Sequence, residues 1–295
     1  MNNKKEEICI LVVSDVHGDS FQFDNIKQIS KMNTIHYDYI FYLGDFDSLH
    51  QEEQNNPAIV KESIDIISQM LLLLETICPN VYYIGGNHDP GVLFSEKAPS
   101  LGKSSKNIHK SYIVIENDLI IAGIGGSTPA IQSDITRSPY HNFKIDNYDH
   151  IIWNGYPYSN SINKEEVSYM KSDSIYEKDL TELSNKIKSE CSSHKIIFLS
   201  HSGPFTSHTS NRVKNDKLIY SGSISLNKFI NEHSKDILMS LHGHTHLSVG
   251  MSKVGNVSVV NPGSLRKGDY CEIKLKRDSE LKWLIKEITF KKIIN

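Results

Sequence analysis

The sequence has few cysteines and no closely spaced pair of them. Cys9, Cys78, Cys191 and Cys271 are its four cysteines, and they lie far apart along a chain of 295 residues. Without a C-x-x-C pair, neither a disulfide framework nor a zinc knuckle is expected. We therefore predict that all four thiols are buried as small hydrophobic side chains.

Long hydrophobic runs are also missing. The first apolar run, residues 8–13, is followed directly by Ser14 and Asp15. It is too short for the apolar part of a signal peptide and lacks a small-residue cleavage site. No stretch approaches the roughly 20 apolar residues that span a bilayer. These absences favour a cytoplasmic protein with no membrane partner.

An excess of charge of either sign is absent as well. The formal net charge is −3 at pH 7, so the chain has no strong basic field, and long nucleic acid is not an expected partner. The hydrophobic fraction is 38%, but these residues are concentrated in runs. We therefore expect them to form the core of an α/β fold, with residues 1–295 as a single domain.

Five of the apolar runs are rich in β-branched residues and end in a short polar cluster. The runs have the length of buried strands and occupy residues 8–13, 39–43, 81–84, 196–199 and 237–241. The clusters are Asp-x-His at 15–17, Gly-Asp at 44–45, Gly-Asn-His-Asp at 86–89, Ser-His at 200–201 and Gly-His-Thr-His at 243–246. Parallel strands carry functional residues at their carboxyl ends, so we expect one parallel sheet to bring all five clusters to one rim.

The side chains in these clusters indicate a site for divalent metal ions. Carboxylate and amide oxygens, together with imidazole nitrogens, are ligands that manganese, iron and zinc accept. Taken singly, each residue is better explained as a helix cap, a turn residue or a loop histidine. Their order, with each cluster behind a strand, favours a shared metal site.

In that order, the five clusters resemble the motifs of the calcineurin-like metallophosphoesterase superfamily. Two further segments, 123–127 and 261–266, resemble its Icc-related branch, which contains cyclic-nucleotide phosphodiesterases. The resemblance covers most of residues 8–275. It implies an α/β fold in the form of a four-layer α/β/β/α sandwich, with two mixed β-sheets flanked by helices.

The resemblance also implies a set of metal ligands. Asp45 would bridge two divalent ions, because each carboxylate oxygen can bind one of them. Thr245 separates two histidines in an extended segment, so each histidine would reach a different ion. The other ligands would be Asp15, His17 and His246 at the first ion, and Asn87, His201 and His244 at the second.

By the same resemblance, catalysis depends on His88 and Asp89. His88 would protonate the leaving group or donate a hydrogen bond to a phosphoryl oxygen, and Asp89 would orient its ring. The substrate would contact Asn87, His88 and Arg266, because a guanidinium binds phosphate well.

Outside the clusters, the sequence predicts helices and a long insertion. Helical spacing of apolar residues predicts helices over 21–32, 58–77 and 176–189, and turn residues at 117–118, 255–256 and 278–279 predict hairpins. Residues 134–174 are polar and aromatic, and segments of this length are often lids or binding loops. We predict that Trp153, Tyr156 and Tyr158 face the leaving group from this insertion.

The predicted function is hydrolysis of a small phosphodiester, cyclic nucleotides included, or of a phosphomonoester, by hydroxide held between two metal ions. Two other functions remain open. A protein phosphatase of this superfamily typically has G-N-H-E, whereas residues 86–89 read G-N-H-D. A non-catalytic scaffold, such as the retromer subunit with this fold, would lose His88 and the ligands that this chain retains. The sequence leaves the oligomeric state open.

Overall fold

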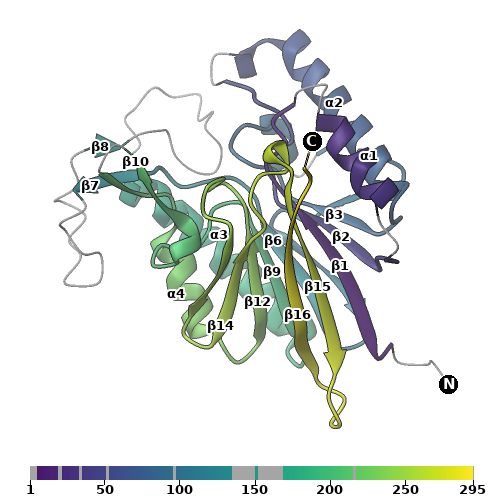
Figure 1. Cartoon of the computed structure of the whole chain (residues 1–295). Coiled ribbons are helices and arrows are strands. Elements are labelled where there is room, and N and C mark those ends of the chain that lie inside the picture. The colour runs from purple at the N-terminus through teal and green to yellow at the C-terminus, as the bar shows by residue number, and fades with distance from the viewer. Residues whose placement is uncertain are drawn as a thin grey trace.

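The structure is a computed structural model that describes residues 5–18, 22–32, 35–50, 53–95, 98–134, 150–151, 169–214 and 217–294. Two large β-sheets lie against each other, and helices cover their outer faces (Figure 1). The predicted four-layer sandwich is confirmed. Within the described residues, no helix combines the length and apolar character needed to cross a membrane.

The first sheet has six strands in the order β16-β15-β1-β2-β3-β4. Their bounds are β1 Glu7–Val13, β2 Tyr39–Tyr42, β3 Val81–Tyr83, β4 Lys106–Asn107, β15 Asp269–Arg277 and β16 Trp283–Lys292. Strands β1 to β4 are parallel, and β15 pairs antiparallel with both β1 and β16. Three of the five polar clusters follow β1, β2 and β3 directly.

The second sheet also has six strands, in the order β13-β14-β12-β9-β6-β5. Their bounds are β5 Ser111–Glu116, β6 Leu119–Ile124, β9 Lys195–Ser200, β12 Ile237–His242, β13 Gly250–Val254 and β14 Val257–Asn261. The four central strands are parallel, and a hairpin partner closes each edge. The remaining two clusters follow β9 and β12. The expectation that one sheet carries all five clusters is therefore wrong, because two sheets share them.

Strand β1 shows why these sequences are buried. Ile8, Ile10 and Val12 point into the core between the two sheets, whereas Leu11 and Val13 point to the opposite face. Successive side chains of a strand alternate between faces, and here both faces are covered. A strand covered on both faces is a continuous hydrophobic run, which is the pattern that the sequence shows.

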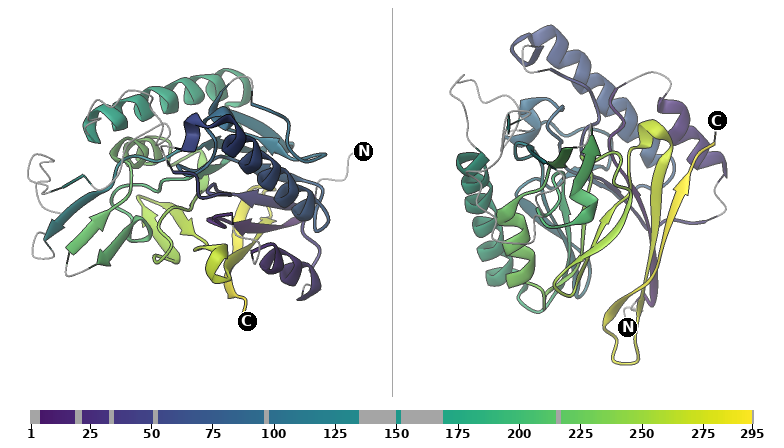
Figure 2. Two further views of the ribbon diagram at one scale, coloured as in Figure 1. Left: turned by 90° about the horizontal axis from the view of Figure 1, so that it is seen from above. Right: turned by 60° about the vertical axis from the view of Figure 1, so that its left-hand side comes forward.

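Two pairs of helices form the outer layers. Helices α1 (Gln22–Met32) and α2 (Pro57–Glu75) pack on the first sheet, and α3 (Tyr169–Cys191) and α4 (Ile224–Glu232) pack on the second. Figure 2 shows the first pair in purple and blue on one side of the molecule and the second pair in green on the other. The predicted helices and hairpins are confirmed, although α3 starts at Tyr169, earlier than the predicted 176. The four cysteines are buried, as predicted.

A third, smaller sheet was not predicted. Its strands lie in the order β10-β11-β7-β8, with bounds β7 Ile131–Asp134, β8 His150–Ile151, β10 Asn211–Lys214 and β11 Lys217–Tyr220. Pairing of β7 with β11 joins segments far apart in sequence, which local patterns do not reveal. Most of the predicted insertion, including Trp153, Tyr156 and Tyr158, lies outside the described residues.

Candidate metal centre

The five polar clusters meet where the carboxyl ends of the two sheets adjoin. A hydrogen bond across the sheets joins the Nδ1 of His201, after β9, to the carbonyl oxygen of Leu43, after β2, at 2.7 Å. The Gly243 N–H donates to the carbonyl of His201 at 3.1 Å. Backbone and side-chain bonds thus hold loops of both sheets around one point.

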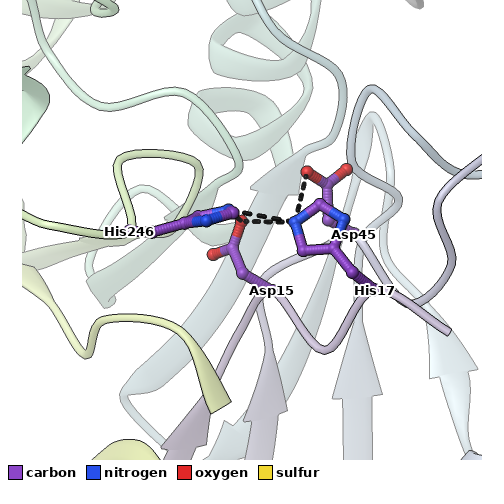
Figure 3. A group of neighbouring side chains, drawn as sticks. All are labelled: Asp15, His17, Asp45 and His246. Carbon is purple, nitrogen blue, oxygen red and sulfur yellow. Dashed lines mark hydrogen bonds and ion pairs between the residues drawn. The ribbon is translucent and has the colours of Figure 1, made fainter. Parts of the chain in front are cut away.

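Two groups of donor atoms form at this point and share one residue. Within each group, all donor atoms lie within 4.8 Å of one another. Asp45 belongs to both groups. Figure 3 shows the first group, with the His17 and His246 rings directed toward the two carboxylates. The first group contains Asp15, His17, Asp45 and His246, and the second contains Asp45, His201 and His244.

The Asp45 carboxylate lies between imidazoles of both groups. Its Oδ2 is 3.2 Å from His201 Nε2 and 3.6 Å from His17 Nε2. Its Oδ1 accepts the backbone N–H of His88 at 2.9 Å. Asn87, which the sequence predicts as a ligand, places its Oδ1 3.1 Å from His201 Nε2. The structure therefore brings Asn87 to the second group, as expected.

Asp15 anchors the first group. Its Oδ1 lies 3.0 Å from His246 Nε2, and its carboxylate oxygens accept the backbone N–H of His244 at 3.0 and 3.2 Å. The Nε2 atoms of His17 and His246 approach to 2.9 Å. Within the described residues, every ion pair of Asp15 and Asp45 is with a histidine. Buried carboxylates whose ion pairs are all with imidazoles form a donor set suited to divalent cations.

Burial and proximity determine the ionisation of this group. Burial raises the pKa of Asp45, but the imidazoles of His201 and His88 outweigh it and hold the pKa well below its usual range. Burial lowers the pKa of His201, but Asp45 and Asp15 raise it to about 9. This raised pKa favours the protonated form of His201 in the absence of a metal ion, and a divalent cation at the site would displace that proton.

Four of the donor residues have left-handed backbone conformations. The φ angle is 56° at Asp15, 58° at His17, 56° at Asp45 and 65° at His244. Left-handed conformations are uncommon outside glycine and cluster at functional sites. The turn Gly243-His244-Thr245 is closed by a bond from Thr245 N–H to the Gly243 carbonyl at 2.7 Å. This tight turn, rather than the predicted extended segment, directs His244 and His246 into different groups.

Asp89 has a different role from the predicted one. Its carboxylate accepts the backbone N–H groups of Asp45 at 2.9 Å, Asp47 at 3.0 Å and Gly86 at 2.7 Å. The Nδ1 of His88 instead lies 3.4 Å from the carbonyl oxygen of Leu49. The prediction that Asp89 orients His88 is wrong, because three backbone donors use the carboxylate. Asp89 holds together the loops after β2 and β3.

His88 lies next to the donor groups without belonging to either. Its ring contacts the His17 ring edge-on, with centroids 5.3 Å apart. Because a carbonyl only accepts hydrogen bonds, Nδ1 carries a hydrogen in its contact with Leu49, and Nε2 takes no part in this contact. Arg266 is exposed, and its backbone N–H donates to the carbonyl of Asp15 at 3.2 Å. Its backbone therefore lies beside the site, and its contact with the substrate stays a prediction.

Several residues near the site belong to none of the sequence motifs. The exposed His50 ring lies edge-on to that of His88, at 6.4 Å. Gln54 bonds the Asp89 carbonyl at 3.1 Å and the Gly91 N–H at 3.2 Å, which ties its segment to the His88 loop. No local pattern could have identified these residues, because tertiary structure alone brings His50 and Gln54 to this loop.

Comparisons with known proteins agree with this architecture. Residues 9–248 match the family described as calcineurin-like phosphoesterase. Over 82 residues, the chain is 38% identical to the protein MJ1162 of Methanocaldococcus jannaschii, a match that covers 28% of this chain and 37% of that protein. The chain thus spans well under half the length of this relative.

Solved structures with similar folds include a dimetal phosphatase from Danio rerio and the protein TT1561 of Thermus thermophilus. The first has a TM-score of 0.55 at 11% identity and covers 98% of this chain and 99% of that chain. The second has a TM-score of 0.54 at 15% identity and covers 97% of this chain and 98% of that chain. At such low identity, these similarities establish the fold alone.

Proposed function

Because the chain belongs to the calcineurin-like phosphoesterase family, we propose that it hydrolyses small phosphate esters with the help of two divalent metal ions. Small phosphodiesters, cyclic nucleotides among them, and phosphomonoesters are the proposed substrates. The observation that supports two metal ions, and not one, is that Asp45 belongs to both donor groups. A carboxylate with two oxygens is suited to bridge a metal pair.

The residues of both groups fit manganese, iron or zinc. Asp15, His17, Asp45 and His246 would hold one ion, and Asp45, Asn87, His201 and His244 the other. When bound, such a pair activates water as a nucleophile and neutralises charge on the phosphoryl group. The buried carboxylates and the bonds between loops prearrange these ligands, which limits the reorganisation needed on binding.

His88 acts on the leaving group in this proposal. Its Nδ1 hydrogen bonds to the Leu49 carbonyl and fixes the ring, so Nε2 can deliver a proton to the departing oxygen. The neutral amide of Asn87 would contact a phosphoryl oxygen without adding charge. Arg266, behind Asp15, would supply a guanidinium to the same phosphate.

The test is turnover by metal-free protein reconstituted separately with manganese, iron and zinc. Substrates are bis(p-nitrophenyl) phosphate, p-nitrophenyl phosphate, and 2′,3′- and 3′,5′-cyclic nucleotides. The expected result is metal-dependent hydrolysis of at least one substrate class, abolished in Asp45→Asn but kept in Asp47→Asn. Two bound ions without turnover of any ester would contradict the enzymatic proposal and favour the scaffold alternative.

A further inference from the structure

A short turn outside every motif contacts the loop that carries two of the donor histidines. This turn is η4 (His208–Ser210), which lies between β9 and β10. Its Thr209 is 4% exposed, and the Oγ1 of Thr209 lies 2.7 Å from the Nε2 of His242, which is fully buried. His242 is the last residue of β12 and precedes the loop 243–246.

The hydrogen bonds of His242 define its tautomer. Its Nδ1 lies 3.0 Å from the carbonyl oxygen of Gly243, which only accepts, so Nδ1 carries the hydrogen. Nε2 must then accept from the Thr209 hydroxyl. That hydroxyl in turn accepts from Ser207 Oγ at 2.5 Å. The Thr209 hydroxyl is therefore the donor that fixes His242 against Gly243.

Asn261 makes a second connection between the same two segments. Its Nδ2 donates to the carbonyl of Thr209 at 3.1 Å and to the carbonyl of Thr245 at 2.9 Å. Its Oδ1 accepts the N–H of Gly263 at 2.9 Å, and the residue is fully buried. Thr209 is thus joined to Gly243 through His242 and to Thr245 through Asn261.

His244 lies between these two anchored positions, in a left-handed conformation with φ 65°. It belongs to the second donor group, whereas His246 belongs to the first. The path of this loop therefore sets where the two imidazoles lie relative to each other. A small change at Gly243 or Thr245 would move one donor group with respect to the other.

We propose that Thr209 and Asn261 are positioning residues that fix the path of the loop 243–246, and with it the spacing of the two metal ions. The inference rests on the proposed function for the presence of two ions. Neither residue touches the donor atoms, and each acts through the loop backbone. Hydrogen-bonded partners behind metal ligands commonly change affinity or activity 10- to 100-fold when removed.

The test compares Thr209→Val, which keeps the shape but removes the hydroxyl, with Thr209→Ser, which keeps the hydroxyl. Cobalt(II) is titrated into metal-free protein and followed by its visible absorption, with a chelator as competitor. We expect Thr209→Val to weaken binding of at least one cobalt ion about 10- to 100-fold and to alter the absorption bands. Thr209→Ser should bind both ions within about 3-fold of the original protein.

Ile230→Val serves as a stability control, because Ile230 is a fully buried residue of α4 in the core behind the second sheet. It should lower the melting temperature without changing cobalt affinity or absorption. Unchanged cobalt binding in Thr209→Val would overturn the inference, as would equal weakening in Ile230→Val at the same melting temperature.

If Thr209→Val does not fold, the cobalt affinity of Asn261→Asp provides a second, independent test. This substitution removes the two N–H donors but keeps the acceptor for Gly263. The same loss of affinity is expected, and unchanged affinity would overturn the role of Asn261. Cobalt affinity decides this inference, whereas turnover decides the proposed function, so the two can fail separately.

Discussion

At the scale of single residues, Asp45 has the largest expected effect. It contributes to both donor groups, and its Oδ2 faces His201 and His17. We expect Asp45→Asn to bind fewer than two ions and to lose turnover, because one substitution removes charge from both groups. Metal content after gel filtration measures this, and Asp47→Asn is the matched control. Two tightly held ions in Asp45→Asn would rule out a bridging Asp45.

His88 offers a residue-scale prediction that separates chemistry from metal binding. His88→Asn should keep both ions and lower kcat roughly 10²- to 10⁴-fold, the usual scale for loss of a general acid. The loss should shrink for leaving groups acidic enough to depart without a proton. A series of aryl esters of graded acidity measures it, with the exposed His36→Asn as control. An equal loss across the series would assign His88 to phosphate binding instead.

At the scale of elements, the loops after β2 and β3 approach each other too closely for side chains. Gly44 has φ 93°, and a Cβ there would lie 2.6 Å from the backbone nitrogen of Gly86. We expect Gly44→Ala to lower the free energy of unfolding by about 1–3 kcal/mol, because the conformation is strained and the loops must part. Urea denaturation of the metal-free protein measures the change.

Gly91→Ala is the control, since a Cβ there meets nothing within 4 Å. It should leave the free energy of unfolding nearly unchanged. Equal effects of the two substitutions would show that the approach of the loops does not limit stability.

The segment between β4 and β5 contains a histidine, His109, that makes the free energy of unfolding depend on pH. Burial lowers the pKa of His109 to about 4, and its Nδ1 accepts the Gly125 N–H at 3.0 Å. The unfolded chain, with a pKa near 6.5, binds a proton that the folded chain does not, so stability falls as pH drops below about 6.5. This histidine should make the free energy of unfolding about 2 kcal/mol lower at pH 5 than at pH 7.

Denaturation of the original protein and of His109→Gln at both pH values measures this contribution. The glutamine keeps an acceptor for Gly125 but does not titrate. The pH difference should therefore shrink by about 2 kcal/mol in the variant. An identical pH dependence in both proteins would contradict the prediction.

The strands also show how much of the fold could be predicted from the sequence. The buried strands were predictable because runs such as 8–13 are hydrophobic on both faces. Their division between two sheets was not, because β1 and β9 are both short apolar runs of the kind that forms buried strands. Strand β8, with two residues, is too short to leave any pattern.

The residues of the candidate site were predictable where a metal-binding side chain lies just after a predicted strand. Asp15, Asp45 and His201 could be identified because each follows a hydrophobic run after a single intervening residue. Thr209 could not, since its contact with His242 depends on how distant segments pack. Asp89 was assigned the wrong partner because adjacency to His88 in sequence says nothing about which groups its carboxylate meets.

At the scale of the whole molecule, each donor group takes residues from both sheets. We therefore expect metal ions to stabilise the folded chain by about 2.7 kcal/mol at a concentration 100 times the dissociation constant. Melting temperatures with increasing manganese, and after chelation, measure this linkage. Asp45→Asn should lose most of the rise. If the melting temperature does not change with manganese concentration, the ions bind the folded and unfolded chains alike.

The origin of the ligands in both sheets also has a consequence for how a newly made chain matures. His244 and His246 lie late in the sequence, and β15, at residues 269–277, must still insert between β1 and β16 to complete the first sheet. Neither donor group is complete in a nascent chain that ends before residue 244, and the first group also needs residue 246. We expect the ions to enter only once residues through 277 have left the ribosome, so that metal uptake follows the pairing of β15 with β1.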